Sequence, residues 1–408
     1  MGRTERHEKG HWGVSNPERE SPDWRTALVQ GSRPDPASGR RFVNPPVVRG
    51  STVLHPSTQD RFSASGEYLE QSLIYGIEGT PTHFALEDMV AAIEGGSRCQ
   101  IVSTGLNAVA VGLLAYARSG SHLLVPDNVY GPTRSFCDRM LSALGVETTY
   151  YPPTASADSL AAYFRQETAA LFVESPGSHT FEVQDVPALA KAARARGVPV
   201  LMDNTWGIHY FQPFRHGVDV SIQALTKYVG GHSDILLGAV TVNDDRSWMR
   251  IRNTAMLLGA YASSDDCWLA LRGARTLAVR LDQQMQAGLV VARWFAERRE
   301  VAEVRHPALP GAPGHDLWRR DFSGAPSLFG VVFRQNIPQK IITAMVDSLR
   351  LFGIGASWGG YESLVLPSFR VKRSGRDGIV DRAVRFHIGL EDTADLLADL
   401  AQGFQVFE

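Results

Sequence analysis

The chain has 408 residues, enough for roughly two to three domains with a sizeable buried core. Its 41 basic and 43 acidic side chains leave a formal net charge of −2, a balance that excludes no fold but gives no support to nucleic-acid or membrane-surface binding. No stretch reaches the ~18 apolar residues of a membrane span. We therefore expect a globular protein that binds neither nucleic acid nor membrane.

The three cysteines, Cys99, Cys137 and Cys267, are far apart in the sequence. Their number and spacing argue against a disulfide framework or a structural zinc site, and they fit a reducing cytoplasm. The first residues contain no apolar run of the kind that a secretory signal needs. We therefore expect a cytoplasmic protein without a metal site.

Residues 1–60 are predicted to form an N-terminal arm and an extended segment. Residues 1–24 are charged and lack apolar periodicity, which predicts a mobile arm. The stretch 25–60 is rich in proline, which predicts an extended segment lying over another part of the fold or over a partner subunit.

Residues 61–255 are predicted to form an α/β domain. A helical spacing of apolar residues covers 84–93, and short apolar runs then alternate with helical patterns. The expected strands are 100–102, 123–126, 170–173, 198–202, 218–222 and 238–242, and the expected helices are 106–118, 133–144, 159–166 and 186–196. Apolar strands that alternate with helices indicate a mostly parallel sheet.

Residues 256–408 are predicted to form a smaller α+β domain. The expected elements are a long helix at 274–298, a strand at 328–333, a helix at 340–349, a strand at 383–388 and a last helix at 393–404.

Two side chains with unusual chemistry follow strands of the predicted sheet. Asp203 ends the strand at 198–202, and Lys227 follows the run at 218–226. Ligands of open α/β sheets bind beyond the carboxyl ends of the strands. A desolvated lysine there can form a Schiff base with an aldehyde cofactor, and an aspartate can keep a pyridine nitrogen protonated. Taken singly, each residue is better explained by a structural role, Asp203 as a helix N-cap and Lys227 as a surface lysine.

A glycine-containing turn at 103–108 lies between an expected strand and an expected helix. Backbone N–H groups at a helix start form a ready phosphate site. No GxxxxGK[ST] or GxGxxG motif occurs, so nucleoside triphosphate and dinucleotide binding lose their usual support.

Several ordered segments resemble the Cys/Met-metabolism family of pyridoxal 5′-phosphate (PLP) enzymes, and within it the cystathionine β-lyases. They are YGIEGTPTHFALEDMVAAIEGG (75–96), ESPGS (174–178), LMDNTW (201–206), DVSIQALTKYVGGHSD (219–234), SWGGYESL (357–364) and RFHIGLED (385–392). The resemblance runs from about residue 25 to the end. It implies the α/β fold of the aspartate aminotransferase-like PLP enzymes (fold type I), with a mostly parallel central sheet in a large domain and a smaller α+β C-terminal domain.

The resemblance implies that PLP is the cofactor and assigns residues to it. Lys227 corresponds to the lysine that carries the cofactor, Asp203 to the partner of the pyridine nitrogen, and Tyr130 to the aromatic residue stacked on the ring. The remaining cofactor residues would be Gly105 and Leu106 through backbone N–H groups, Thr226 through its hydroxyl, Thr205, and Tyr75, which would reach the phosphate of a neighbouring subunit. A shared site implies a homo-oligomer, most simply a tetramer built from dimers. For Tyr130 the alternative is a plain aromatic residue in a turn.

The substrate residues implied by the resemblance lie near the C-terminus. Arg385 would clamp the α-carboxylate of the substrate, and Ser357 and Trp358 would line the same pocket. The alternatives are a structural salt bridge for Arg385 and a core position for Trp358.

Two departures from the β-lyase pattern concern the phosphate and the substrate. Ile77 and Glu78 stand where that pattern has basic residues, and Ala224 stands where the family has serine. Fewer phosphate contacts would weaken cofactor binding. Glu78 would not attract the far carboxylate of cystathionine, so it either pairs with a distal ammonium group of the substrate or faces solvent.

The resemblance implies a carbon–sulfur lyase of transsulfuration and methionine biosynthesis, acting on an amino-acid thioether. By α,β-elimination it would cleave L-cystathionine to homocysteine, pyruvate and ammonia, with Lys227 moving the Cα proton. Tyr130 would take the proton of the substrate amine if the cationic cofactor lowers its pKa. The alternatives are a β-lyase for cystine or another cysteine S-conjugate, a γ-lyase or γ-synthase of the same family, and a catalytically idle regulatory relative.

Overall fold

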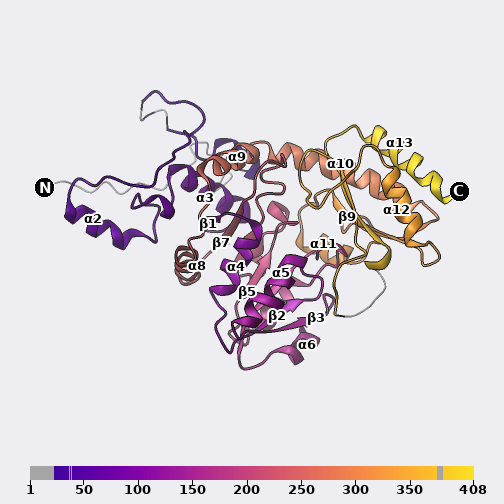
Figure 1. The fold of residues 1–408 in the computed structure, drawn as a ribbon, viewed down its shortest axis with the longest axis horizontal. Coiled ribbons are helices and arrows are strands. Elements are labelled where there is room, and N and C mark those ends of the chain that lie inside the picture. Colours follow the sequence, from indigo (N-terminus) through magenta and orange to yellow (C-terminus); the bar gives the residue numbers. More distant parts are fainter. Residues whose placement is uncertain (1–22, 36, 38, 375–379) are drawn as a thin grey trace.

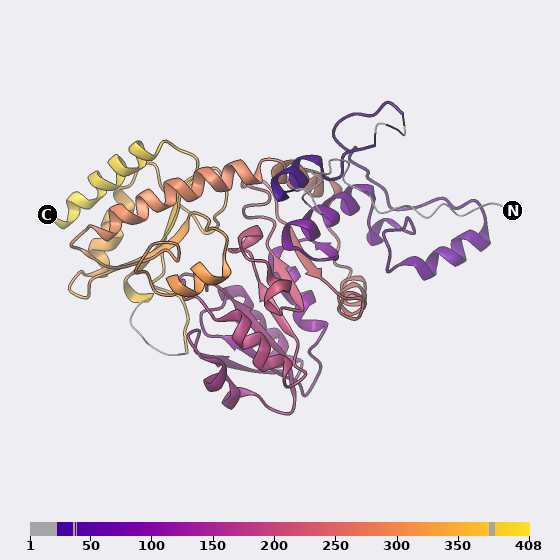
Figure 2. The same cartoon turned by 180° about the vertical axis from the view of Figure 1, so that it is seen from behind.

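The computed structural model describes residues 23–35, 37, 39–374 and 380–408. The predicted mobile arm at 1–24 lies almost wholly outside them. A large α/β part occupies the centre of the molecule, a smaller α+β part lies on one side, and residues of the N-terminal segment project from the other side (Figures 1 and 2). No helix in these described ranges is both long and apolar enough to cross a bilayer.

The central sheet has seven strands in the described chain, in the order β1-β7-β6-β5-β4-β2-β3. The strands are β1 (Arg98–Val102), β2 (His122–Pro126), β3 (Glu147–Tyr151), β4 (Thr168–Glu174), β5 (Val200–Asp203), β6 (Val220–Gln223) and β7 (Gly238–Val242). Neighbours from β6 to β3 pair in parallel, whereas β7 runs antiparallel to both β1 and β6. The prediction of a mostly parallel sheet is confirmed.

Helices cover both faces of this sheet, which explains its continuous apolar strands. Along β2, Leu123 and Val125 pack on the side of α4 and α8, while Leu124 packs on the side of α6 and α7. The helices of the large part are α3 (Pro81–Glu94), α4 (Gly105–Leu114), α5 (Gly131–Ser135), α6 (Ala157–Leu160), α7 (Val186–Arg194), α8 (Asp245–Leu257) and α9 (Ser264–Ala274).

The smaller part is a five-stranded sheet, in the order β10-β11-β12-β9-β8 within the described residues, packed against helices. Its elements are α10 (Leu277–Ala296), β8 (Val301–Arg305), α11 (His315–Asp321), β9 (Leu328–Phe333), α12 (Gln339–Ser348), β10 (Gly353–Ile354), β11 (Leu364–Pro367), β12 (Ala383–His387) and α13 (Thr393–Phe404). Helix α10 runs from the large part along the smaller one (Figure 1).

The long helix predicted at 274–298 is wrong at its start, because the chain breaks between α9 and α10. The carbonyl of Gly273 accepts a hydrogen bond from the guanidinium of Arg280 (2.9 Å) and one from the N–H of Thr276. These donors replace the next helical N–H, so a new helix begins at Leu277.

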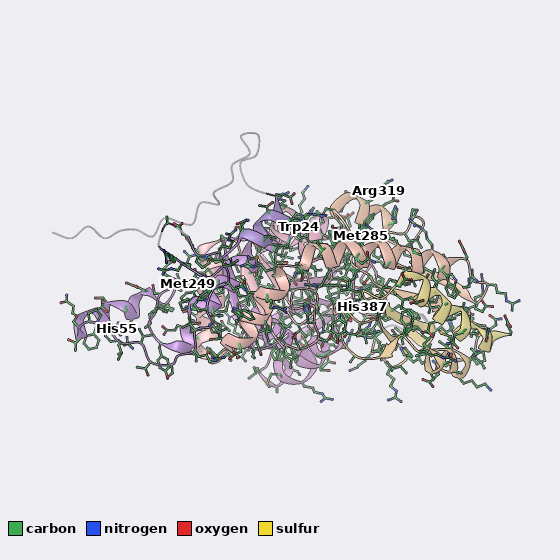
Figure 3. The ribbon with its side chains drawn as sticks, turned by 90° about the horizontal axis from the view of Figure 1, so that it is seen from above. Trp24, His55, Met249, Met285, Arg319 and His387 are labelled. Carbon is green, nitrogen blue, oxygen red and sulfur yellow. The ribbon has the colours of Figure 1, made fainter. Side chains whose placement is uncertain are left out.

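The prediction of an extended segment at 25–60 is wrong in part, because the chain there forms α1 (Trp24–Gln30) and begins α2 (Thr58–Ala64). Asp23 caps α1 by accepting the N–H of Arg25, and Leu28 is buried against the large part. Between and around these helices the chain leaves Phe42 and Leu54 each 92% exposed and Phe62 77% exposed. Figure 3 labels His55 on this projecting segment, well away from His387 in the body of the protein.

Candidate active site

The carboxyl ends of β5 and β6 bring the two residues of the sequence hypothesis together. Asp203 is the last residue of β5, and Lys227 follows β6 after a short turn. Each influences the pKa of the other through its charge. The sheet therefore places an amine and a carboxyl group on the same edge, where open α/β sheets bind ligands.

The amine of Lys227 is desolvated and directed toward the smaller part. Its Nζ donates to Ser357 Oγ (3.0 Å) and lies 5.5 Å from the centre of the Trp358 ring. Burial and the charge of Arg385 together lower the pKa of Lys227 to about 8, although the charge of Asp203 acts in the opposite direction. Roughly a tenth of this amine is consequently neutral at pH 7, far more than for an ordinary lysine.

Asp203 is fixed by the residue two positions further along the chain. Thr205 donates its N–H to Asp203 Oδ1 (3.0 Å), and its hydroxyl accepts the N–H of Ala224 (3.0 Å). Thr205 thus ties the end of β5 to the end of β6. Burial raises the pKa of Asp203, while the bonds from Thr205 and the charge of Lys227 act against that rise.

Arg385 is a buried cation on β12, only 6% exposed. Its Nη2 donates to the carbonyls of Ala356 (2.8 Å) and Ser357 (3.3 Å). No carboxylate of the described chain lies within ion-pair distance of it, so the structural salt bridge considered from the sequence is absent there. Burial lowers the pKa of Arg385 to about 10. A desolvated guanidinium of this kind is suited to a carboxylate brought by a ligand.

Tyr130 lies at the start of α5 and is 39% exposed. Its N–H donates to Glu174 Oε2 (2.8 Å), at the end of β4. Burial raises the pKa of the Tyr130 phenol, the charges of Asp203 and Glu174 raise it further, and Arg385 opposes them. Any lowering of this pKa has to come from a bound cation, as the sequence hypothesis required.

The predicted phosphate turn forms the start of α4. Thr104 caps the helix by accepting the N–H of Asn107 (3.0 Å). The N–H groups of Gly105 and Leu106 lie in the first turn, where no carbonyl of the same helix can accept them. A Cβ at position 105 would lie 2.6 Å from the Cβ of Ala224, so glycine is required for this close approach. The hydroxyl of Thr226 lies on the neighbouring loop and bonds to the backbone of Leu237.

Two predicted residues, Tyr75 and Glu78, lie on the segment before α3 and not in this cluster. Tyr75 is half-exposed and pairs with Thr52 in a single β-bridge. The carbonyl of Glu78 accepts a bond from Arg252 (2.6 Å), and its carboxylate is half-buried rather than fully in solvent. Their roles toward cofactor and substrate stay predictions.

The loop at 357–360 packs tightly on the backbone of Lys227. Gly359 has a φ of +86°, and a Cβ there would lie 2.7 Å from the nitrogen of Tyr228. Its N–H donates to Nε2 of His387 (3.1 Å), whose ring also contacts Tyr228. Burial lowers the pKa of His387 to about 3, which keeps the ring neutral and able to accept.

Sequence reasoning did not single out Glu174, His387 or Glu94, the buried carboxylate discussed below. All three lie within segments that resemble the family, Glu94 in the segment at 75–96, Glu174 in ESPGS and His387 in RFHIGLED. Their partners come from distant parts of the chain, and no spacing rule connects them.

Comparison with known proteins assigns this arrangement to a family. The chain matches the model of the Cys/Met metabolism PLP-dependent enzymes over residues 25–405 and belongs to that family. The fold is accordingly that of the fold type I PLP enzymes.

Individual relatives agree with this assignment. The chain is 45% identical to a putative cystathionine beta-lyase of Rhizobium johnstonii, covering 91% of this chain and 93% of the relative. It is 40% identical to the cystathionine beta-lyase MetC of Escherichia coli, covering 89% and 93%. The crystal structure of metB from Corynebacterium glutamicum superposes with a TM-score of 0.86 at 28% identity, covering 95% of this chain and 99% of that chain.

The residues of the site fit PLP. A lysine with a lowered pKa suits the aldehyde of PLP, and an acid beside it suits the pyridine nitrogen. A partly exposed tyrosine suits the ring, and two helix N–H groups without intrahelical acceptors suit the phosphate. These groups are Lys227, Asp203, Tyr130, Gly105 and Leu106.

Proposed function

We propose that this protein is a PLP-dependent carbon–sulfur β-lyase that cleaves L-cystathionine to homocysteine, pyruvate and ammonia. The observation that carries the proposal is the buried amine of Lys227, whose pKa is lowered to about 8 beside Asp203 and Ser357. The β-lyase relatives support the choice of reaction.

The cofactor would be held by the residues that surround this amine. Lys227 would bind its aldehyde and Asp203 would face its ring nitrogen. Tyr130 would lie on its ring, while Gly105, Leu106 and Thr226 would face its phosphate. Thr205 would act by holding Asp203 in place, since it bonds to that carboxylate. When bound, PLP supplies an electron sink that stabilises negative charge at the substrate Cα.

The substrate would be held by Arg385, which forms a bidentate pair with the α-carboxylate. Ser357 and Trp358 would form the wall beside it. Because Arg385 is already anchored to two backbone carbonyls, it would bind the carboxylate without rearranging.

Proton movements would be shared between two side chains. The Tyr130 oxygen would take the proton of the substrate ammonium, and Nζ of Lys227 would remove the proton on Cα. The same Nζ would return a proton to the sulfur as the carbon–sulfur bond breaks, releasing homocysteine. Addition of water to the remaining three-carbon fragment yields pyruvate and ammonia.

The distal end of the substrate is where Ile77 and Glu78 matter. The half-buried carboxylate of Glu78 favours a distal ammonium over a distal carboxylate as its partner. Since cystathionine carries both groups, and cystine does too, a panel of cystathionine, cystine and smaller thioethers would identify the preferred substrate by pyruvate release.

We propose further that the protein acts as a homo-oligomer, most simply a tetramer built from two dimers, and in the cytoplasm. The exposed apolar residues of the N-terminal segment, among them Leu54 and Phe62, favour association. All three cysteines are buried free thiols, which suits a reducing compartment.

The test replaces Lys227 by Ala. Pyruvate release from cystathionine and the visible absorbance of the purified protein should both be lost. Full activity in Lys227→Ala would refute the assignment. Formation of 2-oxobutyrate instead of pyruvate by the unaltered protein would indicate γ-elimination, and purified protein without any visible absorbance would favour an idle relative.

A further inference from the structure

Glu94 is a carboxylate buried at the heart of the large part. It is the last residue of α3 and is 0% exposed. From there its side chain reaches strands β5 and β6, directly behind the edge that carries Asp203 and Lys227. No cation of the described chain lies within ion-pair distance of it, so hydrogen bonds alone satisfy this carboxylate.

Three side chains donate to Glu94. Gln223 donates from Nε2 to Oε1 (2.5 Å), Asn204 donates from Nδ2 to Oε1 (3.2 Å) and Oε2 (3.3 Å), and the hydroxyl of Ser221 donates to Oε2. The amide of Gln223 also donates to the carbonyl of Asn204 (3.1 Å). These donors favour the ionised form of Glu94, while burial and the charge of Asp203 raise its pKa.

The donors to Glu94 lie next to the two key residues of the site. Asn204 is the residue after Asp203, and Gln223 ends β6, four residues before Lys227. One carboxylate thus connects the chain immediately beyond the acid to the chain that leads to the amine. The backbone N–H of Asn204 also donates to the carbonyl of Ile222 (2.9 Å), and Thr205 accepts from Ala224, so Glu94 adds a side-chain connection to strand ends that are already joined there.

We propose that Glu94 is a positioning residue that sets the separation of Asp203 and Lys227, and hence how the cofactor ring is held between them. The proposal rests on the proposed function. Glu94 touches neither cofactor nor substrate and acts through Asn204 and Gln223. A small displacement of groups around a reacting centre is enough to lower turnover by large factors.

A matched control distinguishes positioning from general burial. Glu87 lies on the same helix, is also buried, and burial raises its pKa to about 7, as burial raises that of Glu94 to about 7. Its partner is Gln71 (3.2 Å), with Arg252 nearby, and it does not contact the ends of β5 or β6. Loss of either carboxylate should therefore destabilise the fold, but only one loss should alter the site.

The experiment compares the holoenzymes of Glu94→Gln, Glu94→Asp and Glu87→Gln. For both Glu94 variants we expect kcat for pyruvate release to fall about tenfold or more, with KM changed less than threefold, and the visible absorbance band of the cofactor to shift. Glu87→Gln should leave kcat and the band unchanged, although its urea midpoint falls. Ser221→Ala, which removes one donor and keeps the carboxylate, should show the same changes more weakly and remains informative if Glu94→Gln does not fold.

Equal kcat and an unchanged band in Glu94→Gln, Glu94→Asp and Ser221→Ala would overturn the inference. An unaltered protein that has no visible band and releases no pyruvate would instead overturn the proposed function, so the two failures are distinguishable.

Discussion

The amine of Lys227 loses its proton at a lower pH than an ordinary lysine does. With a pKa of about 8, roughly a tenth of the molecules carry the neutral amine at pH 7, far more than for the usual value of 10.5. The cause is local, since the side chain is buried and faces the cation Arg385 while Asp203 only partly compensates.

This shift predicts how fast the cofactor-free protein recombines with PLP. Only the neutral amine attacks an aldehyde, so the rate should rise as the pH increases through about 8 and then level off. Stopped-flow absorbance between pH 6 and 10 measures it, with Lys227→Ala as the blank for other lysines. A rate that keeps rising to pH 10 would show that the amine is not desolvated.

Arg385 gives a prediction about substrate binding. Arg385→Lys keeps the charge but loses the forked geometry, so kcat/KM should fall about 10- to 100-fold, the equivalent of ~1.5–3 kcal/mol for a charged hydrogen bond. The visible cofactor band should remain as in the unaltered protein, which confirms that the loss concerns the substrate. An unchanged kcat/KM would assign Arg385 a purely structural role.

At the scale of single residues, the sequence predicts what lies at strand ends and misses what lies behind them. Lys227 and Asp203 are recognisable because each follows an apolar strand, and the fold places strand ends together. Glu94 looks like an ordinary helix residue in the sequence, and Glu174, although it ends β4, carries no signal that separates it from other polar residues at strand ends. Their importance arises from partners such as Asn204 and Tyr130, which only the folded chain brings near.

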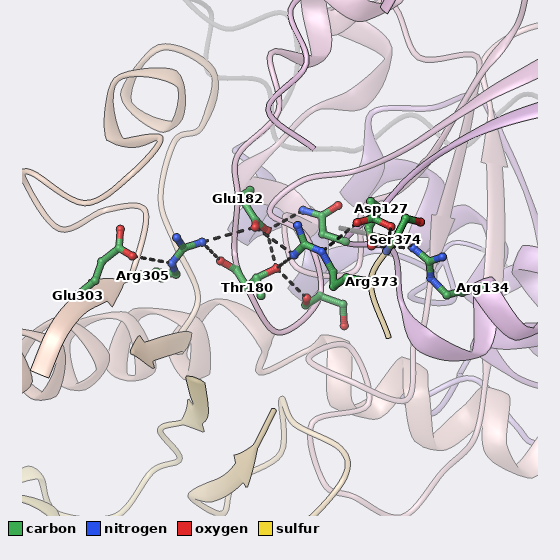
Figure 4. Close-up of polar contacts among 10 residues, drawn as sticks. Asp127, Arg134, Thr180, Glu182, Glu303, Arg305, Arg373 and Ser374 are labelled. Carbon is green, nitrogen blue, oxygen red and sulfur yellow. Dashed lines mark hydrogen bonds and ion pairs between the residues drawn. The ribbon is translucent and has the colours of Figure 1, made fainter. Parts of the chain in front are cut away.

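Among the elements, a buried ionic network joins the loops of the large part to the smaller part (Figure 4). Arg373 donates to Asp127 Oδ2 (3.2 Å) and to Glu182 Oε1 (3.1 Å), and Arg305 at the end of β8 donates to the carbonyl of Thr180 (2.7 Å). Burial alone would raise the pKa of Glu182, but Arg373 and the other donors outweigh it and lower that pKa.

Removing Arg373 should therefore destabilise the fold strongly. Arg373→Met leaves two buried carboxylates with fewer partners, and we expect the free energy of unfolding to fall by about 3–5 kcal/mol. The neighbouring Lys372→Met removes an exposed pair with Asp138 and should change it by less than ~1 kcal/mol. Urea unfolding of both variants measures the difference, and equal effects would contradict the role of the network.

The sequence predicted most of the elements but not all. Strands buried on both faces, such as β4 and β7, stand out as apolar runs. Strand β3 at the sheet edge was missed, because its residues are only partly buried and read as polar and aromatic. The antiparallel direction of β7 was not predicted, since strand direction depends on the connection and not on the apolar run itself.

At the scale of the whole molecule, Tyr75 pairs with Thr52 of the N-terminal segment, and its side chain is 48% exposed. This agrees with a site completed by a second subunit, and mixed oligomers provide the test. Co-expressed, differently tagged Lys227→Ala and Tyr75→Ala chains should form hybrids in which one of two sites is entirely unaltered.

Such hybrids should recover about half of the unaltered activity per dimer, because two-fold symmetry pairs each site with the other chain's tyrosine. Pyruvate release by doubly tagged hybrids is compared with that of each parent. Activity no greater than the mean of the parents would mean that Tyr75 serves its own subunit or none.

The contact of Gly359 with the backbone of Lys227 and Tyr228 bears on how ligands enter. The backbone of Gly359 packs directly on the backbone of Lys227 and Tyr228, and its N–H donates to His387, so we expect the smaller part to stay in place at this point when a ligand binds. Of the residues proposed to hold the cofactor, Tyr130 and Leu106 are 39% and 38% exposed. The fixed contact at Gly359 thus restricts the route by which substrate and product exchange to the part of the site that does not face the 357–360 loop.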